Sequence, residues 1–429
     1  MLTFIAILFL LAVLMVFRMP IAFAMGLVGF FGLAAQLGLR PALAVLERTF
    51  YDTSSSFILV AIPLFILMAE LLTAGDVTRR AIIACQSWIG HVKGGLAMAT
   101  VGASVLLAAL VGSSTASTAA MSASAFPEMR RHNYSDRLAA AVVSVGGTLA
   151  VVVPPSIVLV VYGVLTETSI GKLFIAGIVP GLLTAAGLAV VIKVIAHTTD
   201  QAPRGARFEA KKALLDSRHV IPMAMLMVAV IGAIYAGIAS PSEAAALGVM
   251  GSLIIVLFQR SLSFAAFNQS VSGAIRATVM IVTIVACSAI FANYLAFTRI
   301  TQNMLEFVAT TDLPPAAIMG IIILALLVMG MFMDQLAILS LAMPLAFPIA
   351  MALEYNPVWF GIVVTKTVEI GLLTPPLGLN AYVAAAQTGV PLRTIFRGIL
   401  PFLGMELIVL LLLICFPQVT LFLPDFMTR

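Results

Sequence analysis

The stretch LVGSSTASTAAMSASAFPEM, from Leu110 to Met129, places seven hydroxyl side chains within the twelve residues Ser113–Ser124. A soluble protein would carry such a stretch in a surface loop. Here it lies in a run of 34 residues, Gly94–Pro127, that contains no ionisable side chain, within a chain that is 62% hydrophobic. The stretch therefore has to be explained inside a membrane.

The composition is that of a polytopic membrane protein. Only 10% of the 429 residues are charged and the mean hydropathy is +1.16, which leaves too little polar surface for a soluble globule. The apolar runs are continuous and do not alternate with polar residues as barrel strands do, so we predict an all-α fold. The length allows about ten to twelve membrane segments of about 20 residues each.

The composition and the first residues argue against a nucleic-acid-binding protein, a disulfide or metal site, and a signal peptide. The net charge of +5 is accompanied by no basic face or aromatic platform, so we expect no nucleic-acid partner. The three cysteines are widely spaced in apolar sequence, without disulfide or metal-ligand spacing. Leu2–Phe17 has no basic residue before it and no small-residue cleavage site after it, and we interpret it as a first span rather than a signal peptide.

Charged or turn-rich breaks divide the sequence into predicted spans near 2–17, 20–38, 56–74, 138–165, 173–197, 220–238, 243–258, 277–297, 358–386 and 399–423. Two further apolar blocks, 94–127 and 313–353, fit no single span. The first would form a helix of about 50 Å, against a hydrocarbon core of about 30 Å. Folded in half, each block enters the bilayer without crossing it, so we predict two re-entrant helical hairpins.

This topology agrees with the distribution of positive charge. With both blocks treated as hairpins, most of the 23 Lys and Arg residues fall on the cytoplasmic side, as the positive-inside rule requires. Both termini are then predicted to lie in the periplasm. Counting either block as a complete span would remove the charge bias.

The sequence also contains an internal repeat. At an offset of 221 residues, Phe126-Pro127 aligns with Phe347-Pro348, and Pro154-Pro155 aligns with Pro375-Pro376. The two predicted hairpins enter the membrane from opposite sides, so the two halves have inverted topology. Many secondary transporters are built in this way.

The hydroxyl stretch falls at the tip of the first hairpin. Non-helical backbone at membrane depth is tolerated where it lines a cavity or is buried in protein, and hydroxyl and carbonyl oxygens suit a dehydrated alkali cation. The alternative is that small hydroxyl residues only allow helices to pack closely. We expect that packing role for Ser122 and Ser124, and a ligand role for Ser113, Ser114 and Thr115.

Each hairpin is followed by a span that prolines should break. VGGTLAVVVPPSIVLVVYG, from Val145, contains Pro154-Pro155, and TVEIGLLTPPLGLNAYV, from Thr367, contains Pro375-Pro376. Two prolines remove two helical donors and bias the preceding residue away from the helical conformation. Two broken helices, each paired with a hairpin in an inverted repeat, predict two cation sites with a substrate site between them.

Several ionisable residues lie in apolar sequence. Asp334 is the only one between Asp312 and Glu354 and is the repeat equivalent of Ser113. Because an intramembrane carboxylate is costly, we favour cation binding over packing for Asp334. For Lys366 and Glu369 we favour mutual neutralisation over substrate contact. We interpret Glu70 and Glu243 as residues that snorkel at or cap the ends of spans.

A different class of function, an intramembrane serine hydrolase, needs a base within hydrogen-bonding reach of its nucleophile. No His lies at the depth of the hydroxyl stretch, which counts against this class. The sequence also contains no phosphate-binding loop or metal-ligand cluster. We therefore expect no enzyme activity and no cofactor other than a coupling ion.

The sequence resembles one family, the large membrane subunit (DctM or SiaM type) of tripartite ATP-independent periplasmic (TRAP) transporters. The resemblance covers essentially the whole chain and rests on GSSTAST at 112–118, GGTLAVVVPPSIVLVVYG at 146–163, MGMFMDQLAIL at 329–339 and EIGLLTPPLGLNAYV at 369–383. It implies an elevator-type transporter of the bacterial inner membrane that uses a sodium gradient to import an organic acid, such as a C4-dicarboxylate or sialic acid. It also implies a small four-helix membrane subunit and a periplasmic substrate-binding protein as partners.

Carried over by motif, the resemblance implies a first sodium site formed by Ser113, Ser114, Thr115, Gly147, Thr148 and Pro154. It implies a second formed by Gly330, Asp334, Gly371 and Thr374, and substrate contacts from Ser117, Ser156, Pro376, Gly378 and Asn380. An elevator implies a mobile transport domain of residues 94–197 and 313–423, a scaffold of 1–93 and 198–312, and a tail of 424–429. The nearest alternative is a sodium/carboxylate symporter that needs no binding protein.

Overall fold

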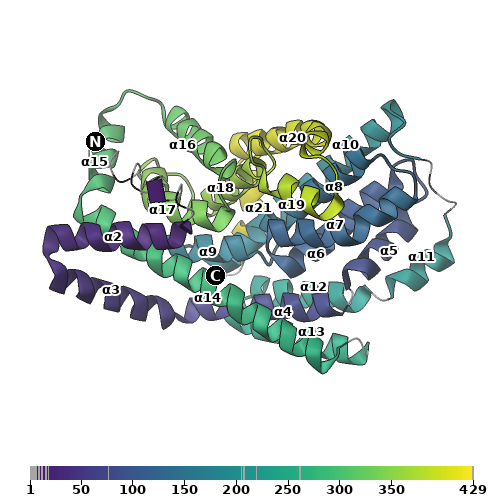
Figure 1. Ribbon diagram of the computed structural model, residues 1–429, viewed down its shortest axis with the longest axis horizontal. Coiled ribbons are helices and arrows are strands. Elements are labelled where there is room, and N and C mark those ends of the chain that lie inside the picture. Colours follow the sequence, from purple (N-terminus) through teal and green to yellow (C-terminus); the bar gives the residue numbers. More distant parts are fainter. Residues whose placement is uncertain are drawn as a thin grey trace.

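The computed structural model describes residues 7, 10, 13, 14, 17, 19–75, 77–203, 205, 208–218, 220–259 and 262–427. Over these residues the protein is helical and contains no strand, which confirms the predicted all-α fold (Figure 1). The predicted first span, 2–17, falls largely outside the described residues.

The helices form three groups, and the third is drawn from two separate parts of the chain. The first group contains α2 (Ile21–Leu37), α3 (Leu39–Ser54), the 3-10 helix η1 (Phe57–Val60), α4 (Ala61–Ala74) and α5 (Val77–Ile89). The middle group contains α11 (Ala210–Ser217), α12 (Ile221–Tyr235), α13 (Pro241–Phe258), α14 (Phe264–Phe297) and α15 (Ile300–Thr310). The third group consists of two matching series of five helices, followed by α21 (Gln418–Asp425).

The two series confirm the internal repeat. The first contains α6 (Gly95–Val111), α7 (Ser114–Arg131), α8 (Asp136–Val152), α9 (Ile157–Thr166) and α10 (Ile170–Thr198). The second contains α16 (Pro315–Gly330), α17 (Gln335–Ala352), α18 (Pro357–Gly371), α19 (Leu379–Thr388) and α20 (Leu392–Cys415). The first residues of α7 and α17, and of α8 and α18, are 221 positions apart, so the proline offset in the sequence reflects a structural repeat.

The two series exchange partners in a reciprocal way. Helix α7 packs against α19 while its counterpart α17 packs against α9, and α8 packs against α20 while α18 packs against α10. Each hairpin therefore rests on the helix that follows the break in the other series. The two series form one interlocked unit.

Both predicted hairpins are present. Only Gly112 and Ser113 separate α6 from α7, and only residues 331–334 separate α16 from α17; in each pair the two helices pack against each other. Arms of 16 to 18 residues are about 25 Å long, shorter than a hydrocarbon core of about 30 Å. Paired arms of this length, joined by breaks of two and four residues, fit re-entrant hairpins that enter the bilayer and return to the same side.

Seven helical stretches in the described part of the chain are long and apolar enough to cross a membrane: Phe57–Ala74, Asp136–Thr166, Ile170–Thr198, Pro241–Phe258, Phe264–Phe297, Gln335–Ala352 and Leu392–Cys415. Six of them overlap predicted spans, although α14 begins well before residue 277. Gln335–Ala352 qualifies by length and composition, yet it is the second arm of a hairpin. The remaining expected spans appear as the shorter helices α2 and α12 and as the broken pair α18 and α19.

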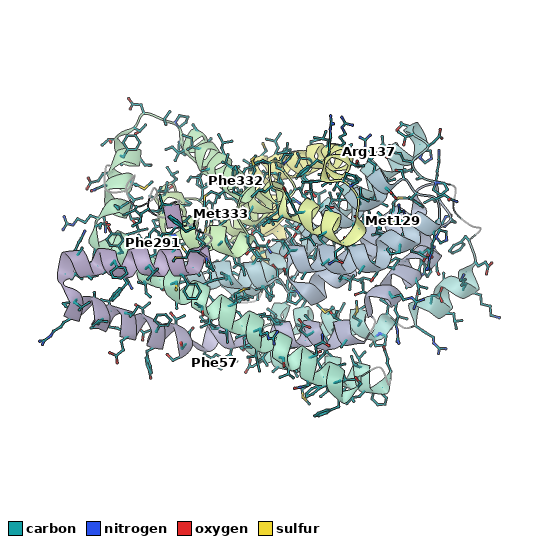
Figure 2. The ribbon with its side chains drawn as sticks, viewed as in Figure 1. Phe57, Met129, Arg137, Phe291, Phe332 and Met333 are labelled. Carbon is teal, nitrogen blue, oxygen red and sulfur yellow. The ribbon has the colours of Figure 1, made fainter. Side chains whose placement is uncertain are left out.

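Helices α2, α3, α4, α13 and α14 pack together in a layer beside the interlocked unit. Helix α14, which at 34 residues is about 51 Å long, packs against α2, α3 and α4, and α4 packs against α13. Figure 1 shows α3, α4 and α13 along the lower edge, with the two series above them. Phe57 on the outside of this layer is 67% exposed whereas Phe291 of α14 is buried (Figure 2), the distribution expected of a surface that faces lipid.

Local sequence explains where the helices begin. Ser135 Oγ accepts a hydrogen bond from Leu138 N (3.2 Å) at the start of α8, and its repeat equivalent Asn356 accepts from Val358 N (2.9 Å) at the start of α18. Ser240 and Glu243 form a complete capping box at the start of α13, which confirms the predicted capping role of Glu243. Equivalent caps thus set equivalent helix starts in the two series.

Candidate ion and substrate site

The first hairpin tip is a break in helical backbone of two residues. Gly112 ends α6 in the left-handed conformation (φ 59°), which favours glycine, and Ser113 is extended (φ −132°, ψ 126°). The Ser113 and Thr115 hydroxyl oxygens lie 3.4 Å apart. The backbone carbonyls at the end of α6 and the amides at the start of α7 meet at this point, which places Ser113, Ser114 and Thr115 at the tip as predicted.

The first broken helix lies beside this hairpin. Helix α8 ends at Val152, the Pro154-Pro155 bond is cis, and α9 begins at Ile157. Ser156 caps α9 and also donates to Val151 O (2.5 Å). The predicted break is therefore present, with Pro154 and Ser156 buried inside it.

Two residues predicted for the first sodium site lie on α8 before the break. Gly147 faces α7, where an added Cβ would lie 2.0 Å from Thr118 Oγ1. Thr148 is buried and donates to Val145 O within its own helix (2.7 Å). Both residues are close to the hairpin, but the hydroxyl of Thr148 is already engaged.

The second hairpin tip carries Asp334 as the cap of α17. Its Oδ2 accepts a hydrogen bond from Leu336 N (3.1 Å), so the carboxylate has a structural role as well as its predicted ion-binding one. The next side chain, Gln335, is only 2% exposed, and its Oε1 has no hydrogen-bond partner. Such an orphaned acceptor is costly inside a protein unless something fills its coordination.

The second broken helix contacts the second hairpin through two glycines. A Cβ added to Gly371 would lie 2.5 Å from Gly330 Cα, so only glycine permits this approach of α16 to α18. Thr374 Oγ1 donates to Ile370 O (2.7 Å), and the Pro375-Pro376 bond is cis. Gly330, Gly371 and Thr374 therefore lie together, while Pro376 is exposed and Gly378 is the N-cap of α19.

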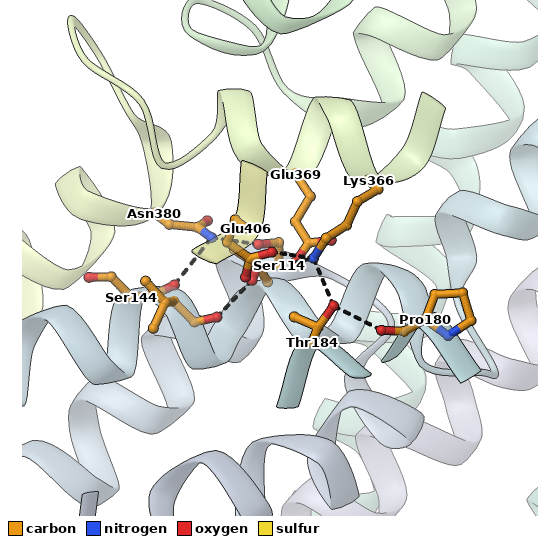
Figure 3. Close-up of polar contacts among 10 residues, drawn as sticks. Ser114, Ser144, Pro180, Thr184, Lys366, Glu369, Asn380 and Glu406 are labelled. Carbon is orange, nitrogen blue, oxygen red and sulfur yellow. Dashed lines mark hydrogen bonds and ion pairs between the residues drawn. The ribbon is translucent and has the colours of Figure 1, made fainter. Parts of the chain in front are cut away.

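The two repeats meet at Asn380. This buried side chain on α19 donates to Ser114 Oγ (2.6 Å) at the first tip and to Ser144 O (3.5 Å) on α8, as Figure 3 shows. Asn380 Oδ1 and the buried Ser117 Oγ have no hydrogen-bond partner. The structure thus joins one predicted substrate residue, Asn380, to the first hairpin across a sequence separation of 266 residues.

One cavity connects the two hairpin tips. A space of about 520 Å³ is lined by Ser113 and Thr115 of the first tip, by Asp334 and Gln335 of the second, and by Glu70 of α4. Met280 and Ile281 of α14 close another side. The other predicted site residues, apart from these tip residues, do not line this cavity.

The sequence interpretation did not assign Glu70 and Gln335 to a site. Glu70 is the only ionisable residue in the predicted span 56–74, and Gln335 is a lone amide beside Asp334 in an apolar block. Those signals were available, but whether the side chains face a cavity depends on how α4 packs against the hairpins.

A second polar group lies in the interior, on α10, α18 and α20 (Figure 3). Lys366 Nζ donates to Thr184 Oγ1 (3.0 Å) and Glu369 Oε1 (3.3 Å) and forms an ion pair with Glu406. All three charged side chains are fully buried. The predicted pairing of Lys366 with Glu369 is confirmed, and Glu406, a carboxylate in the last long span, was not anticipated.

Comparisons with known proteins agree with the motifs. The family model described as "Tripartite ATP-independent periplasmic transporter, DctM component" matches residues 8–419. The chain is 39% identical over 378 residues to a C4-dicarboxylate TRAP transporter large permease protein of Pseudomonas aeruginosa, with 88% of each chain covered. It is 32% identical over 373 residues to a sialic acid TRAP transporter large permease protein of Vibrio cholerae, with 86% of this chain and 87% of that one covered.

Among solved structures, the fold is similar to that of the Alcanivorax borkumensis YdaH transporter, which is described as having an unusual topology. The TM-score is 0.63, and the alignment covers 89% of each chain at 12% identity. At that identity the likeness concerns the fold alone.

Proposed function

The chain belongs to the DctM components of tripartite ATP-independent periplasmic transporters, and from this premise we propose that it imports a small organic acid together with sodium ions by an elevator movement. The family consists of transporter permeases rather than enzymes. Membership and several apolar helices make the chain a multi-pass protein of the inner membrane. The proposal concerns three properties of this transporter: sodium as the coupling ion, an organic acid as the cargo, and an elevator movement as the mechanism.

The observation that carries the proposal is the cavity shared by the two hairpin tips. Hydroxyl, carboxylate and backbone carbonyl oxygens are the ligands that hard cations prefer, and discontinuous helices supply them at membrane depth. The orphaned Oε1 of Gln335 fits a cation and not an anion. Ser113, Ser114 and Thr115 would hold one sodium ion, with Gly147, Thr148 and Pro154 supporting that tip.

The second sodium ion would lie where the second tip meets the second break. The close approach of Gly330 to Gly371 brings backbone carbonyls from two helices near each other, and Thr374 and Asp334 follow Gly371 and Gly330 by three and four residues. Sodium held at both breaks would offset the repulsion between Asp334 and an anionic cargo. Binding of cation and anion would therefore support each other.

The cargo would be a carboxylate bound between the two sodium ions, with Ser117, Ser156, Pro376, Gly378 and Asn380 as contacts. The two relatives compared above are named for C4-dicarboxylate and sialic acid, so both are candidate cargoes. As one component of a tripartite system, the chain would work with a small membrane subunit and a periplasmic substrate-binding protein.

The interlocked packing of the two series supports an elevator movement. Reciprocal contacts between them let α6–α10 and α16–α20 move as one body, against a scaffold formed by the first and middle groups of helices. Five crossings, if α12 is one of them, separate the two hairpins. An odd number places the hairpins on opposite sides of the membrane, as an inverted repeat requires.

Sodium coupling is tested by uptake into proteoliposomes that contain this chain, its small subunit and its binding protein. Radiolabelled succinate and sialic acid are supplied under an inward sodium gradient, with potassium replacing sodium as the control. We expect uptake of one of them to rise more than linearly with sodium. Equal uptake in sodium and potassium would refute the coupling.

The elevator is tested with two single substitutions that pair with native free cysteines. A Cβ at Gly102 of α6 would lie 3.8 Å from Cys85 Cβ of α5, and one at Gly26 of α2 would lie 3.3 Å from Cys287 Cβ of α14, near the spacing of a disulfide. Oxidised Gly102→Cys links the moving body to the scaffold and should stop uptake until it is reduced. Oxidised Gly26→Cys links two scaffold helices and should leave uptake intact, and equal inhibition by both would contradict the elevator.

A further inference from the structure

The cavity between the hairpin tips has a wall that belongs to neither repeat. Glu70 lies on α4, outside the interlocked unit, and faces the same space of about 520 Å³ as Asp334 and Gln335. Its backbone carbonyl accepts from Ser270 Oγ (3.3 Å) on α14. An added Cβ at Gly273 would lie 3.2 Å from the Glu70 carboxyl, so the bare backbone of α14 leaves room for this carboxylate.

The lining has an unbalanced charge. The described residues around the cavity include the carboxylates of Glu70 and Asp334 but no Lys, Arg or His. Among the described side chains, none forms an ion pair with either carboxylate. The other polar side chains around the cavity carry oxygen atoms that can coordinate a cation. One of these atoms, Gln335 Oε1, is buried without a hydrogen-bond partner.

From this geometry we infer that Glu70, Gln335 and Asp334 form an additional cation site, an entry position that sodium occupies before it moves to the two sodium sites at the helix breaks; Asp334 is shared between this position and the second sodium site. A cleft lined by one sign of charge concentrates counter-ions, and oxygen ligands from α4 and from the second tip would replace part of the ion's water. An anion entering first would meet two carboxylates. The inference rests on the proposed sodium coupling and adds to it a residue of the scaffold.

The site also has a consequence for the transport cycle. Glu70 belongs to the scaffold whereas Asp334 and Gln335 belong to the moving body, so the three side chains can meet in only one position of an elevator. The cation would therefore bind here in the state that the structure represents and lose the Glu70 contact when the body moves. Entry and transport of the ion would use different ligand sets.

The experiment measures binding of sodium alone, without any cargo, to the purified full chain with its small subunit. Sodium-22 binding is titrated at constant ionic strength with potassium. Glu70→Gln removes one charge at nearly constant shape and should weaken sodium binding by about threefold to tenfold. Glu47→Gln, the same substitution at an exposed position of α3 outside the cavity, should leave it unchanged.

A second variant works in the opposite direction. Gln335→Glu adds a carboxylate to the same wall and should tighten sodium binding by a similar factor, which a misfolded protein would not do. If the wild type binds no sodium, the proposed coupling fails. If the wild type binds sodium but Glu70→Gln and Gln335→Glu bind it with unchanged affinity, the coupling stands and the entry site is wrong.

Discussion

Replacing Lys366 by Met should destabilise the protein strongly, whereas replacing Glu406 by Gln should not. Two fully buried carboxylates, Glu369 and Glu406, share one fully buried ammonium. Lys366→Met leaves both carboxylates without a counter-charge. Glu406→Gln leaves the neutral pair of Lys366 and Glu369, with their separation of 3.3 Å.

The size of the effect follows from this geometry. One ion pair at 3.3 Å is worth about 5 kcal/mol at an effective dielectric constant of about 20. Removing one partner of a buried pair costs about 3–5 kcal/mol because the other charge stays buried and unpaired. We therefore expect Lys366→Met to lose about 3–5 kcal/mol, and Glu406→Gln to change stability by less than about 1.5 kcal/mol because it removes excess negative charge.

The assay is thermal unfolding of the purified protein in detergent, followed by intrinsic fluorescence. For a chain of 429 residues, a loss of 1 kcal/mol lowers the unfolding midpoint by about 1 °C, so Lys366→Met should lower it by about 3–5 °C. The triple variant Lys366→Met, Glu369→Gln, Glu406→Gln should recover most of that loss. Equal midpoints for Lys366→Met and Glu406→Gln would refute the assignment of a net negative buried cluster.

Three further predictions concern the hairpins. Asp334→Asn should make uptake rise less steeply with sodium while the protein remains folded, and an unchanged steepness in a folded variant would remove Asp334 from the ion sites. Gly371→Ala places a Cβ 2.5 Å from Gly330 Cα and should lower sodium-dependent uptake more than tenfold; Gly404→Ala, where a Cβ meets nothing within 4 Å, is the control and should leave uptake unchanged. Cysteines at the exposed positions Lys212 and Ala352 should react with impermeant reagent only from the cytoplasm and only from the periplasm, respectively. Reaction of both from one side would be incompatible with hairpins that enter from opposite faces.

The class of the protein and the positions of its helix breaks could be predicted from the amino-acid sequence. The lengths of the apolar runs predict membrane-spanning helices, because a helix needs about 20 apolar residues to cross a bilayer. The pairs Pro154-Pro155 and Pro375-Pro376 predict the breaks, because proline interrupts helical hydrogen bonding wherever it occurs. The tips at Ser113 and Asp334 followed from the middle of each long apolar block. The repeat offset between the two proline pairs then predicted the matching starts of α7 and α17.

Which of these residues meet could be learned only from the packing of the helices. Asn380 reaches Ser114 across 266 residues, and Glu406 reaches Lys366 from a different helix. Neither contact leaves a local pattern in the sequence, because each depends on how two helices are packed together. The orientation of the Glu70 side chain also depends on helix packing and leaves no local pattern in the sequence. A lone carboxylate in an apolar span can equally well snorkel to the membrane surface or face a cavity, and the packing of α4 against α14 turns this one toward the hairpin tips.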